Sequence, residues 1–232
     1  MRFTYFLAFY ARDGAARASA ADIARAVEIA RTTPRVTKAM VYTPERAPDP
    51  FVEYPPPPQL AFQLYFDEID ALEAALGTKG HLQALSRPEA LPSVDKSGAQ
   101  QQAMVARAFP TPDPVFRTPA GEMPCSDVIH YPGQAEDLNA WLKFYLDSHA
   151  PMIVRLPNIR AAEIYTRLDY VSTLPWPRVD YMQRNKVVFD SVAAVAAALQ
   201  SPMRAEMRAD FLRFPKFTEG NRHNPMATRF VV

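Results

Sequence analysis

The sequence predicts an α+β protein made of two tandem ferredoxin-like β-α-β-β-α-β repeats, which close into one α+β barrel within a single chain. Three observations lead to this prediction. Segments of the first half recur in the second half at a common offset, and both halves show the same order of strand and helix patterns. A proline-rich linker at 110–124 separates the two halves.

The internal repeat is clearest in FDEIDALEAAL at 66–76, which recurs as FDSVAAVAAAL at 189–199 with six of eleven positions identical. Residue 66 thus corresponds to residue 189, an offset of 123. The same offset aligns TPRVTKAMVYT (33–43) with LPNIRAAEIYT (156–166), including Pro34 with Pro157 and Tyr42 with Tyr165. Matches between alanine-rich helices arise by chance, but the proline and Tyr-Thr pairs are not explained in that way. We therefore predict a first repeat at 1–115 and a second at 120–232.

Each repeat gives the same order of elements. In the first repeat we expect strands at about 2–11, 35–43, 59–66 and 101–109, and helices at about 19–31 and 67–77. In the second we expect strands at about 125–131, 159–168, 182–189 and 225–232, and helices at about 135–155, 190–200 and 202–211. Glu136 and Asp137 suit the positive end of a helix dipole, and Pro202 suits a first helical turn.

The N-terminal segment has two interpretations, a first strand or a secretory signal peptide. Arg2 followed by FTYFLAFYA imitates a secretory signal peptide. The apolar run is short, however, and Tyr and Phe favour strands, so a buried first strand is the preferred interpretation. No run of 18 apolar residues occurs, so we expect no membrane partner.

Charge and cysteine content limit the classes of partner. Twenty-six Lys and Arg residues balance 25 Asp and Glu residues, for a net charge of +1, so nucleic acid is not expected as a partner. A single cysteine, Cys125, excludes an internal disulfide and fits a cytoplasmic location. We expect neither a cofactor nor a metal, because there is no glycine-rich phosphate loop and no paired metal-ligand motif.

The most informative residue is His149. Apolar residues recur at helical spacing along 135–156, and His149 stands where this stripe needs its next member. Burial there should lower the pKa of the ring, and a neutral histidine can act as a general base. Pro151 lacks the N–H that would bond the carbonyl of Asp147, so the helix should bend or loosen beside His149.

His149 also has a purely structural interpretation. A single histidine on an apolar face is often a core residue whose ring bonds a carbonyl. The repeat supplies a comparison, because His149 corresponds to Ala26 in the first half. The fold therefore does not require this histidine, which predicts one site per chain.

The second repeat resembles a known family. HAPMIVRLPNIRAAEIY (149–165) is similar to the His-x-Pro and Leu-Pro-Gly signature of the EthD-like proteins, with Asn158 in place of the glycine. The segment 189–214 resembles a later strand and helix of that family. The resemblance implies the dimeric α+β barrel superfamily and a small hydrophobic ligand, often an aromatic or a lactone. It does not fix the reaction, because one fold hosts many functions.

Other residues are candidates for the walls of the site. Trp141, Tyr145 and Met152 would shape a substrate pocket around His149, and His130 and Tyr165 would line it. Tyr165 has the alternative of a structural role, since Tyr42 stands at the matching position. On the strand 125–131, either His130 or Asp127 would approach His149, depending on which face meets the helix. Three further sets carry weaker expectations: Arg167 and Arg184 as anion contacts, Cys125 as an unreactive thiol, and His81 and His223 as loop residues.

Two functions remain open from the sequence. The first is a cofactor-independent isomerase, cyclase or oxidoreductase that uses His149 to transfer a proton on a small aromatic, lactone or quinol-type molecule. The second is a non-enzymatic ligand-binding or accessory protein of an oxidative catabolic pathway. A small hydrophobic molecule is the expected partner in both, and a homo-oligomer of the two-repeat chain is compatible with either.

Overall fold

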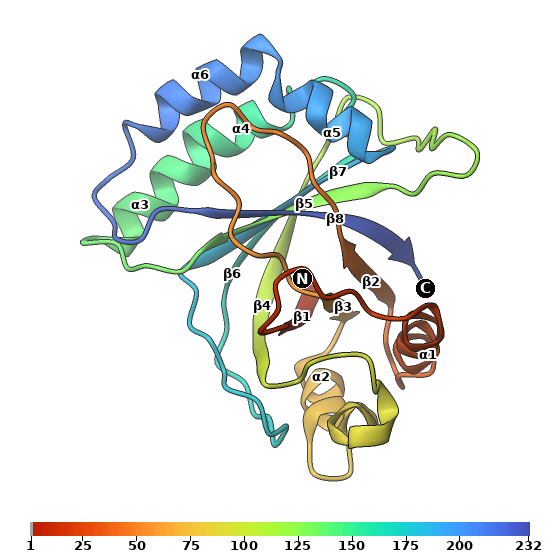
Figure 1. Cartoon of the computed structure of the whole chain (residues 1–232). Coiled ribbons are helices and arrows are strands. Elements are labelled where there is room, and N and C mark those ends of the chain that lie inside the picture. The colour runs from red at the N-terminus through yellow and green to blue at the C-terminus, as the bar shows by residue number, and fades with distance from the viewer. Residues whose placement is uncertain (1) are drawn as a thin grey trace.

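The chain folds into a closed eight-stranded antiparallel barrel with helices on its outer surface (Figure 1). The structure is a computed structural model and describes residues 2–232. The strand order around the barrel is β1-β3-β2-β8-β5-β7-β6-β4. The predicted fold of two ferredoxin-like repeats in one barrel is confirmed.

The elements follow the predicted order closely. The strands are β1 (Arg2–Tyr10), β2 (Lys38–Pro44), β3 (Leu60–Phe66), β4 (Gly98–Phe109), β5 (Cys125–Tyr131), β6 (Ala161–Arg167), β7 (Gln183–Phe189) and β8 (Arg222–Phe230). The helices are α1 (Ala20–Arg31), α2 (Ile69–Leu76), the 3-10 turns η1 (His81–Ser86) and η2 (Pro88–Ala90), α3 (Leu138–Phe144), the π-helical turn η3 (Tyr145–His149), α4 (Ala150–Ile153), α5 (Val192–Leu199) and α6 (Pro202–Phe211). The 3-10 turns η1 and η2 were not predicted, and the helix expected at 135–155 is interrupted by η3.

The two halves join edge to edge. Strand β2 of the first half pairs with β8 of the second, with Tyr42 opposite Thr228. Strand β4 of the first half pairs with β6 of the second, with Ala106 opposite Tyr165. These two seams are equivalent under the 123-residue offset, so the barrel has an approximate two-fold relation. Closure removes the exposed sheet edges that a single repeat would present.

The backbone repeats as well as the sequence. Arg35 and Asn158 occupy equivalent positions before β2 and β6, and both have left-handed backbone, with φ of 60° and 61°. Asn tolerates this conformation, which accounts for Asn158 where the EthD-like pattern has glycine. Arg35 adopts it without that advantage, so the tight turn is imposed by the fold at both places.

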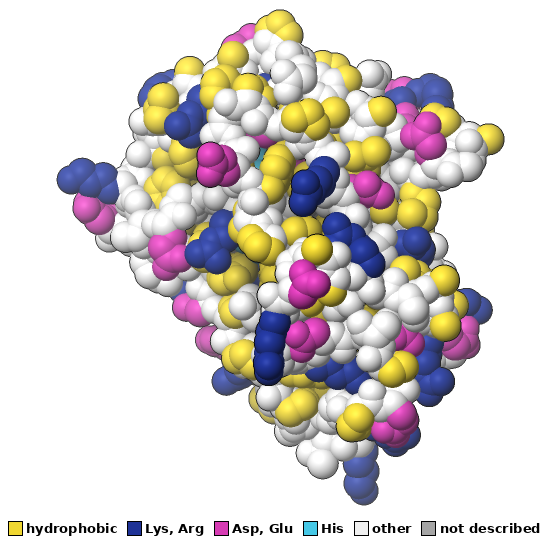
Figure 2. All heavy atoms as spheres, in the orientation of Figure 1, with side chains coloured by type: hydrophobic (Ala, Val, Ile, Leu, Met, Phe, Trp, Pro, Cys, Tyr) yellow, Lys and Arg dark blue, Asp and Glu magenta, His cyan; other side chains and the backbone are white. Residues whose placement is uncertain are grey.

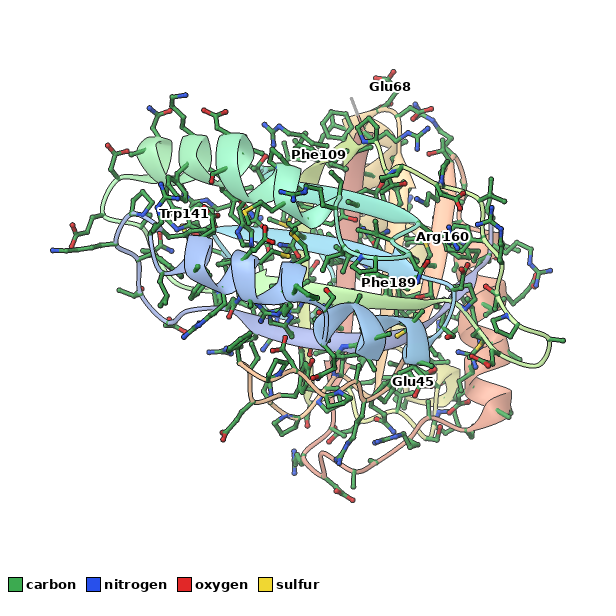
Figure 3. The ribbon with its side chains drawn as sticks, turned by 90° about the horizontal axis from the view of Figure 1, so that it is seen from above. Glu45, Glu68, Phe109, Trp141, Arg160 and Phe189 are labelled. Carbon is green, nitrogen blue, oxygen red and sulfur yellow. The ribbon has the colours of Figure 1, made fainter. Side chains whose placement is uncertain are left out.

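Apolar side chains form three clusters. One lies between the barrel and α1–α2, one lies between the barrel and α3–α6, and a smaller one fills part of the barrel interior. Seen from above, the α3–α4 and α5–α6 segments run side by side over the strands of the second half (Figure 3). Any ligand site between helix and sheet in this half must therefore lie beneath both segments.

A long connection crosses from the first half to the second. We call residues 45–57, between β2 and β3, the strap; it appears orange in Figure 1, where it rises from the barrel to α4, α5 and α6. Ala47 of the strap belongs to the apolar cluster of the second half. The matching connection between β6 and β7 crosses the other way, and its Trp176 packs edge-on to Phe9 with ring centroids 5.2 Å apart. Each half therefore covers the helix layer of the other.

The surface seen in Figure 2 mixes hydrophobic side chains with interspersed charges of both signs. Within residues 2–232, no helix is both long and apolar enough to cross a bilayer.

Candidate functional site

The site lies in the second half, between the helices and the outer face of the sheet. A cavity of about 50 Å³ opens there beneath α4 and α6. Its apolar wall comes from both layers and includes Ile129, Ile153, Leu156, Val187, Met207 and Phe211. Its polar wall is formed by Asp127, His149, Asn185, Arg204, Arg208, Asn221 and His223. A space of this size holds a few water molecules, since about 10–15 Å³ suffices for one.

His149 reaches this cavity from a π-helical turn. The N–H of Ala150 bonds the carbonyl of Tyr145, five residues earlier, and Pro151 begins the short helix α4 directly afterwards. Proline cannot donate its own backbone bond, so the turn widens where the normal ladder fails. The predicted loosening beside His149 is thus present as η3. The corresponding segment of the first half, α1, is a regular α-helix with Ala26 buried at the matching position.

His149 is held by Asp210. Nδ1 of His149 lies 2.9 Å from Oδ2 of Asp210, and the hydroxyl of Ser148 donates to the other carboxylate oxygen at 2.6 Å. Asp210 is 4% exposed and lies in the last turn of α6, where the helix dipole disfavours a negative charge. The donors His149 and Ser148 stabilise the buried carboxylate, and Nη1 of the exposed Arg213 lies 3.8 Å from its Oδ1. The hydrogen bond to Asp210 therefore fixes the orientation of the His149 imidazole; it does not stabilise helix α6.

The pair fixes the protonation state of His149. Burial lowers the pKa of the ring below its usual range, while Asp210 opposes the shift, so the ring is neutral near pH 7. Because the carboxylate accepts the hydrogen bond, Nδ1 carries the proton and Nε2 has a free lone pair. No described residue bonds to Nε2. The arrangement of a base held by a carboxylate is the one that general-base catalysis uses.

A second histidine–aspartate pair lies in the same cavity. Nδ1 of His223 lies 2.7 Å from Oδ2 of Asp127, and the amide nitrogen of Asn221 lies 3.2 Å from Nε2 of His223. Both nitrogens of this ring are therefore occupied, unlike those of His149. The sequence predicts His223 in a loop, but it lies on β8, which pairs with β5. The sequence feature that could have pointed to His223 is Asp127, a carboxylate on a buried strand that needs a hydrogen-bond donor.

The strap closes the outside of the cavity. Nε of Arg204, on α6, donates to Oδ2 of Asp49 at 2.9 Å, and the same guanidinium lies 5.3 Å from the ring of Phe51. Val52 contributes to the cavity wall, and the ring of Tyr54 lies edge-on to His223. The carboxylate of Asp49 is fully buried. A buried ion pair thus joins the first half of the chain to the site of the second.

Trp141, Tyr145 and Met152 belong to the apolar cluster beside the cavity but do not form its wall, and of these three only Tyr145 packs against the ring of His149, at 5.1 Å between centroids. The rings of Trp141 and Tyr145 stack at 5.2 Å and are both fully buried, and Trp141 projects between the two helical segments (Figure 3). Tyr145 contacts the wall through Asn185, whose amide donates to its hydroxyl. Met152 is partly buried against the same cluster. Their roles in substrate binding stay predictions.

His130 and Tyr165 lie on the other side of the sheet. His130 points into the end of the barrel, where Nη1 of Arg184 approaches its Nε2 at 2.9 Å. Tyr165 lies in the barrel interior and donates to Glu163 Oε2 at 2.8 Å. The structure therefore brings neither residue to the His149 cavity; Asp127, the alternative on β5, is the one that approaches it.

The interior of the barrel holds a buried ion pair. Nζ of Lys186 lies 2.8 Å from Oε2 of Glu163, and the hydroxyl of Tyr65 donates to the same oxygen at 2.6 Å. Burial lowers the pKa of Lys186 to about 8, against the attraction of Glu163. Although burial opposes it, the nearby lysines Lys186 and Lys38 lower the pKa of Glu163 well below its usual range. This network shares the barrel interior with the smaller apolar cluster there.

A metal centre is not built by the described residues. Across 2–232, no three His, Cys, Asp or Glu side chains gather closely enough to hold an ion together.

Comparison with known proteins places the chain by its fold. No family model and no curated protein matches the sequence. Among solved structures, an anthrone oxidase-like protein superimposes with a TM-score of 0.63 at 12% identity, over 99% of this chain and 93% of its own. A candidate monooxygenase from Fusobacterium nucleatum gives 0.59 at 5% identity, over 99% and 93%. Another from Lactobacillus acidophilus gives 0.52 at 9% identity, over 99% and 95%.

Each likeness spans nearly the whole of both chains, so the two-repeat arrangement is shared and not only the single repeat. Identities this low establish architecture and leave the chemistry to the residues of the site. With the closed barrel and the two equivalent seams described above, the chain has the dimeric α+β barrel fold, with both ferredoxin-like halves in one chain.

Proposed function

We propose that this protein is a cofactor-independent enzyme that removes a proton from a small hydrophobic aromatic or quinol-type molecule, with His149 as the base. The observation that carries the proposal is the contrast between the two histidines of the cavity. His223 has both ring nitrogens bonded, whereas His149 is held at Nδ1 by Asp210 and keeps Nε2 free. A neutral imidazole held in this way is suited to accept a proton.

The walls support an apolar substrate. Aliphatic and aromatic side chains make up most of the lining, and an apolar surrounding keeps His149 neutral and excludes water from the reacting atoms. Most polar side chains of the wall already bond to other protein groups, as His223 does to Asp127 and Arg204 does to Asp49. Such a lining favours a substrate with a flat apolar body and one acidic hydrogen.

The names of similar folds make oxygen-dependent oxidation the preferred reaction. One is called anthrone oxidase-like and two are candidate monooxygenases. In this chain, Nε2 of His149 would take a C–H or O–H proton, and the electron pair would stay on the substrate as an enolate or phenolate. Dioxygen then accepts the electrons; a ring CH₂ and O₂ give a C=O group and water. Isomerisation or cyclisation would begin with the same proton transfer.

Access requires the strap to move. The cavity of about 50 Å³ is too small for a molecule of two or three rings, and Val52 forms part of its wall. The adjoining surface hollow along the strap is much larger, about 740 Å³, and shares Val52 and His223 with the cavity. We infer that substrate enters from this hollow as the strap shifts outward.

Oxygen consumption with anthrone and with alkylated hydroquinones tests the proposal. We expect turnover by the purified protein without added cofactor, and a fall in kcat of about 10²–10⁴-fold in His149→Ala, the range that one acid–base group supplies. Ligand affinity should change little. His81→Gln is the control, because His81 lies in the first half and bonds the carbonyl of Ile29. Turnover that survives His149→Ala contradicts the proposal.

The non-enzymatic alternative gives a different result. A ligand-binding or accessory protein would bind the same molecules, detected by the shift of the His149 ring signals in NMR spectra of histidine-labelled protein, and would show no turnover with any of them. The neutral, carboxylate-held state of His149 would then serve packing alone.

A further inference from the structure

The end of the barrel near His130 has an unusual buried charge. Arg184 on β7 is 4% exposed, yet no carboxylate of residues 2–232 lies within ion-pair distance of its guanidinium. Its Nε donates to Gln102 Oε1 at 3.1 Å and its Nη1 to His130 Nε2 at 2.9 Å. Its planar group also lies 4.9 Å from the ring of Phe6 and 4.6 Å from that of Tyr181.

These partners are all neutral, so the positive charge is not compensated. Arginine stays protonated in proteins, and a buried charge without a counter-charge is costly. Burial accordingly lowers the pKa of Arg184. A bound anion near Arg184 would compensate this buried positive charge and so stabilise the folded protein.

His130 presents a donor next to this charge. Its Nε2 accepts from Arg184, so a neutral ring carries its proton on Nδ1. Burial, and then the charge of Arg184, hold the pKa of His130 well below its usual range, which keeps the ring neutral. No described residue bonds to Nδ1. The ring therefore has one free N–H.

A recess at the barrel end gives access to His130. We call it the barrel-end recess; it measures about 270 Å³ and is lined by Tyr10, Pro55, Pro56, Gln100, His130, Tyr181, Arg222 and Asn224. A smaller hollow behind it shares His130 and Asn224 and reaches Arg184. Neither lining contains Asp or Glu. Arg222 at the rim is half exposed and bonds Glu219 at 3.1 Å, so its charge is only partly offset.

We propose that the barrel-end recess binds a small aromatic carboxylate, which His130 and Arg222 contact and the charge of Arg184 attracts. The rings of Tyr10 and Tyr181 and the flat faces of Pro55 and Pro56 supply a surface for an apolar ring. The charge and the ring surface together select an organic acid over a neutral aromatic. His130 and Asp127 leave β5 on opposite faces, so this site is separate from the His149 cavity and does not depend on the proposed function.

Titration with sodium benzoate tests the site, with benzamide as the neutral probe of the same shape and inorganic phosphate as the anion without a ring. We expect benzoate to shift the ring signals of His130 in NMR spectra of histidine-labelled protein and to leave those of His149 in place. Benzamide should bind at least about tenfold more weakly, because it lacks the charge. Phosphate should also bind more weakly, because it lacks the ring.

Variants locate the interaction. Arg184→Gln should weaken benzoate binding about tenfold or more, and Arg222→Gln, at the exposed rim, provides the same test if Arg184→Gln does not fold. Arg167→Gln is the matched control, since Arg167 is a partly exposed arginine on β6 that is paired with Asp180. The proposal is overturned if benzoate fails to shift His130, if it binds as well to every folded variant of Arg184 and Arg222, or if equimolar phosphate outcompetes it.

Discussion

Nδ1 of His149 lies 2.9 Å from Oδ2 of Asp210, which joins the π-helical turn η3 to the last turn of α6 across 61 residues of sequence. Both side chains are buried. The contact holds the neutral ring of His149 in one tautomer. The protonation of His149 therefore affects both the free energy of unfolding and the proposed proton transfer.

Stability should fall as the pH is lowered from about 7.5 to 5.5. The folded pKa of His149 lies below the unfolded value of roughly 6.5, so the unfolded chain binds more protons in this range. His130 acts in the same direction. The urea midpoint should be lower at pH 5.5, and the difference should shrink in His149→Gln but not in His81→Gln. An equal pH dependence in all three proteins would show that His149 titrates normally.

The carboxylate of Asp210 should support the pKa of His149. Asp210→Asn removes the charge that opposes the effect of burial, so the histidine pKa should fall further. NMR titration of histidine-labelled protein measures it directly, with Asp147→Asn as a control, since Asp147 is exposed and pairs with Lys143. A higher His149 pKa in Asp210→Asn would contradict the hydrogen bond described here.

Removing one partner of the Lys186–Glu163 pair should be far more damaging than removing both. Lys186 is 1% exposed, and Lys186→Met leaves a buried carboxylate with only hydroxyl donors and the more distant Lys38. We expect a loss of about 3–5 kcal/mol in the free energy of unfolding. Lys186→Met with Glu163→Gln should recover most of it. Urea unfolding of the four proteins of this cycle gives the coupling, and additive losses would refute it.

The strap should open when its ion pair is broken. Asp49→Asn leaves the buried guanidinium of Arg204 without a charged partner, and hydrogen bonds to charged groups contribute about 1.5–3 kcal/mol. Amide hydrogen exchange in residues 47–53 should therefore speed up by roughly tenfold or more. Glu53→Gln, on the exposed side of the same strap, should leave exchange unchanged. Equal exchange in both variants would mean that the strap is held by its apolar contacts.

Trp141 should matter for stability more than Met152. Trp141 is fully buried among the rings of Tyr131, Tyr145 and Phe214. Trp141→Ala should cost about 3–5 kcal/mol by urea unfolding. Met152→Ala, at a partly buried position, should cost less. A larger loss of stability in Met152→Ala than in Trp141→Ala would contradict this prediction.

Several features of the fold follow from the sequence because their causes are local. The repeat, the order of strands and helices, and the boundaries of β5 and α6 come from hydrophobic period, capping and proline placement, which act within a few residues. The same is true of η3, since Pro151 removes a backbone donor wherever the helix lies. The burial of His149 follows from its place on the apolar stripe.

The partners of the site depend on the tertiary structure. Asp210 meets His149 across 61 residues, His223 meets Asp127 across 96, and Asp49 meets Arg204 across 155. Residue spacing within one helix or strand does not predict these contacts, because strand pairing around the closed barrel brings the segments together.

Strand β5 shows the limit most clearly. All seven of its residues are buried, because the helices cover its outer face and the barrel encloses its inner face. The alternation that distinguishes two faces of a half-exposed strand is therefore absent, and the sequence could not decide between His130 and Asp127. By itself the sequence determined that a neutral histidine is buried in the second repeat. Only closure of the barrel decided that Asp127 faces the helices with it and that His130 faces the interior with Arg184.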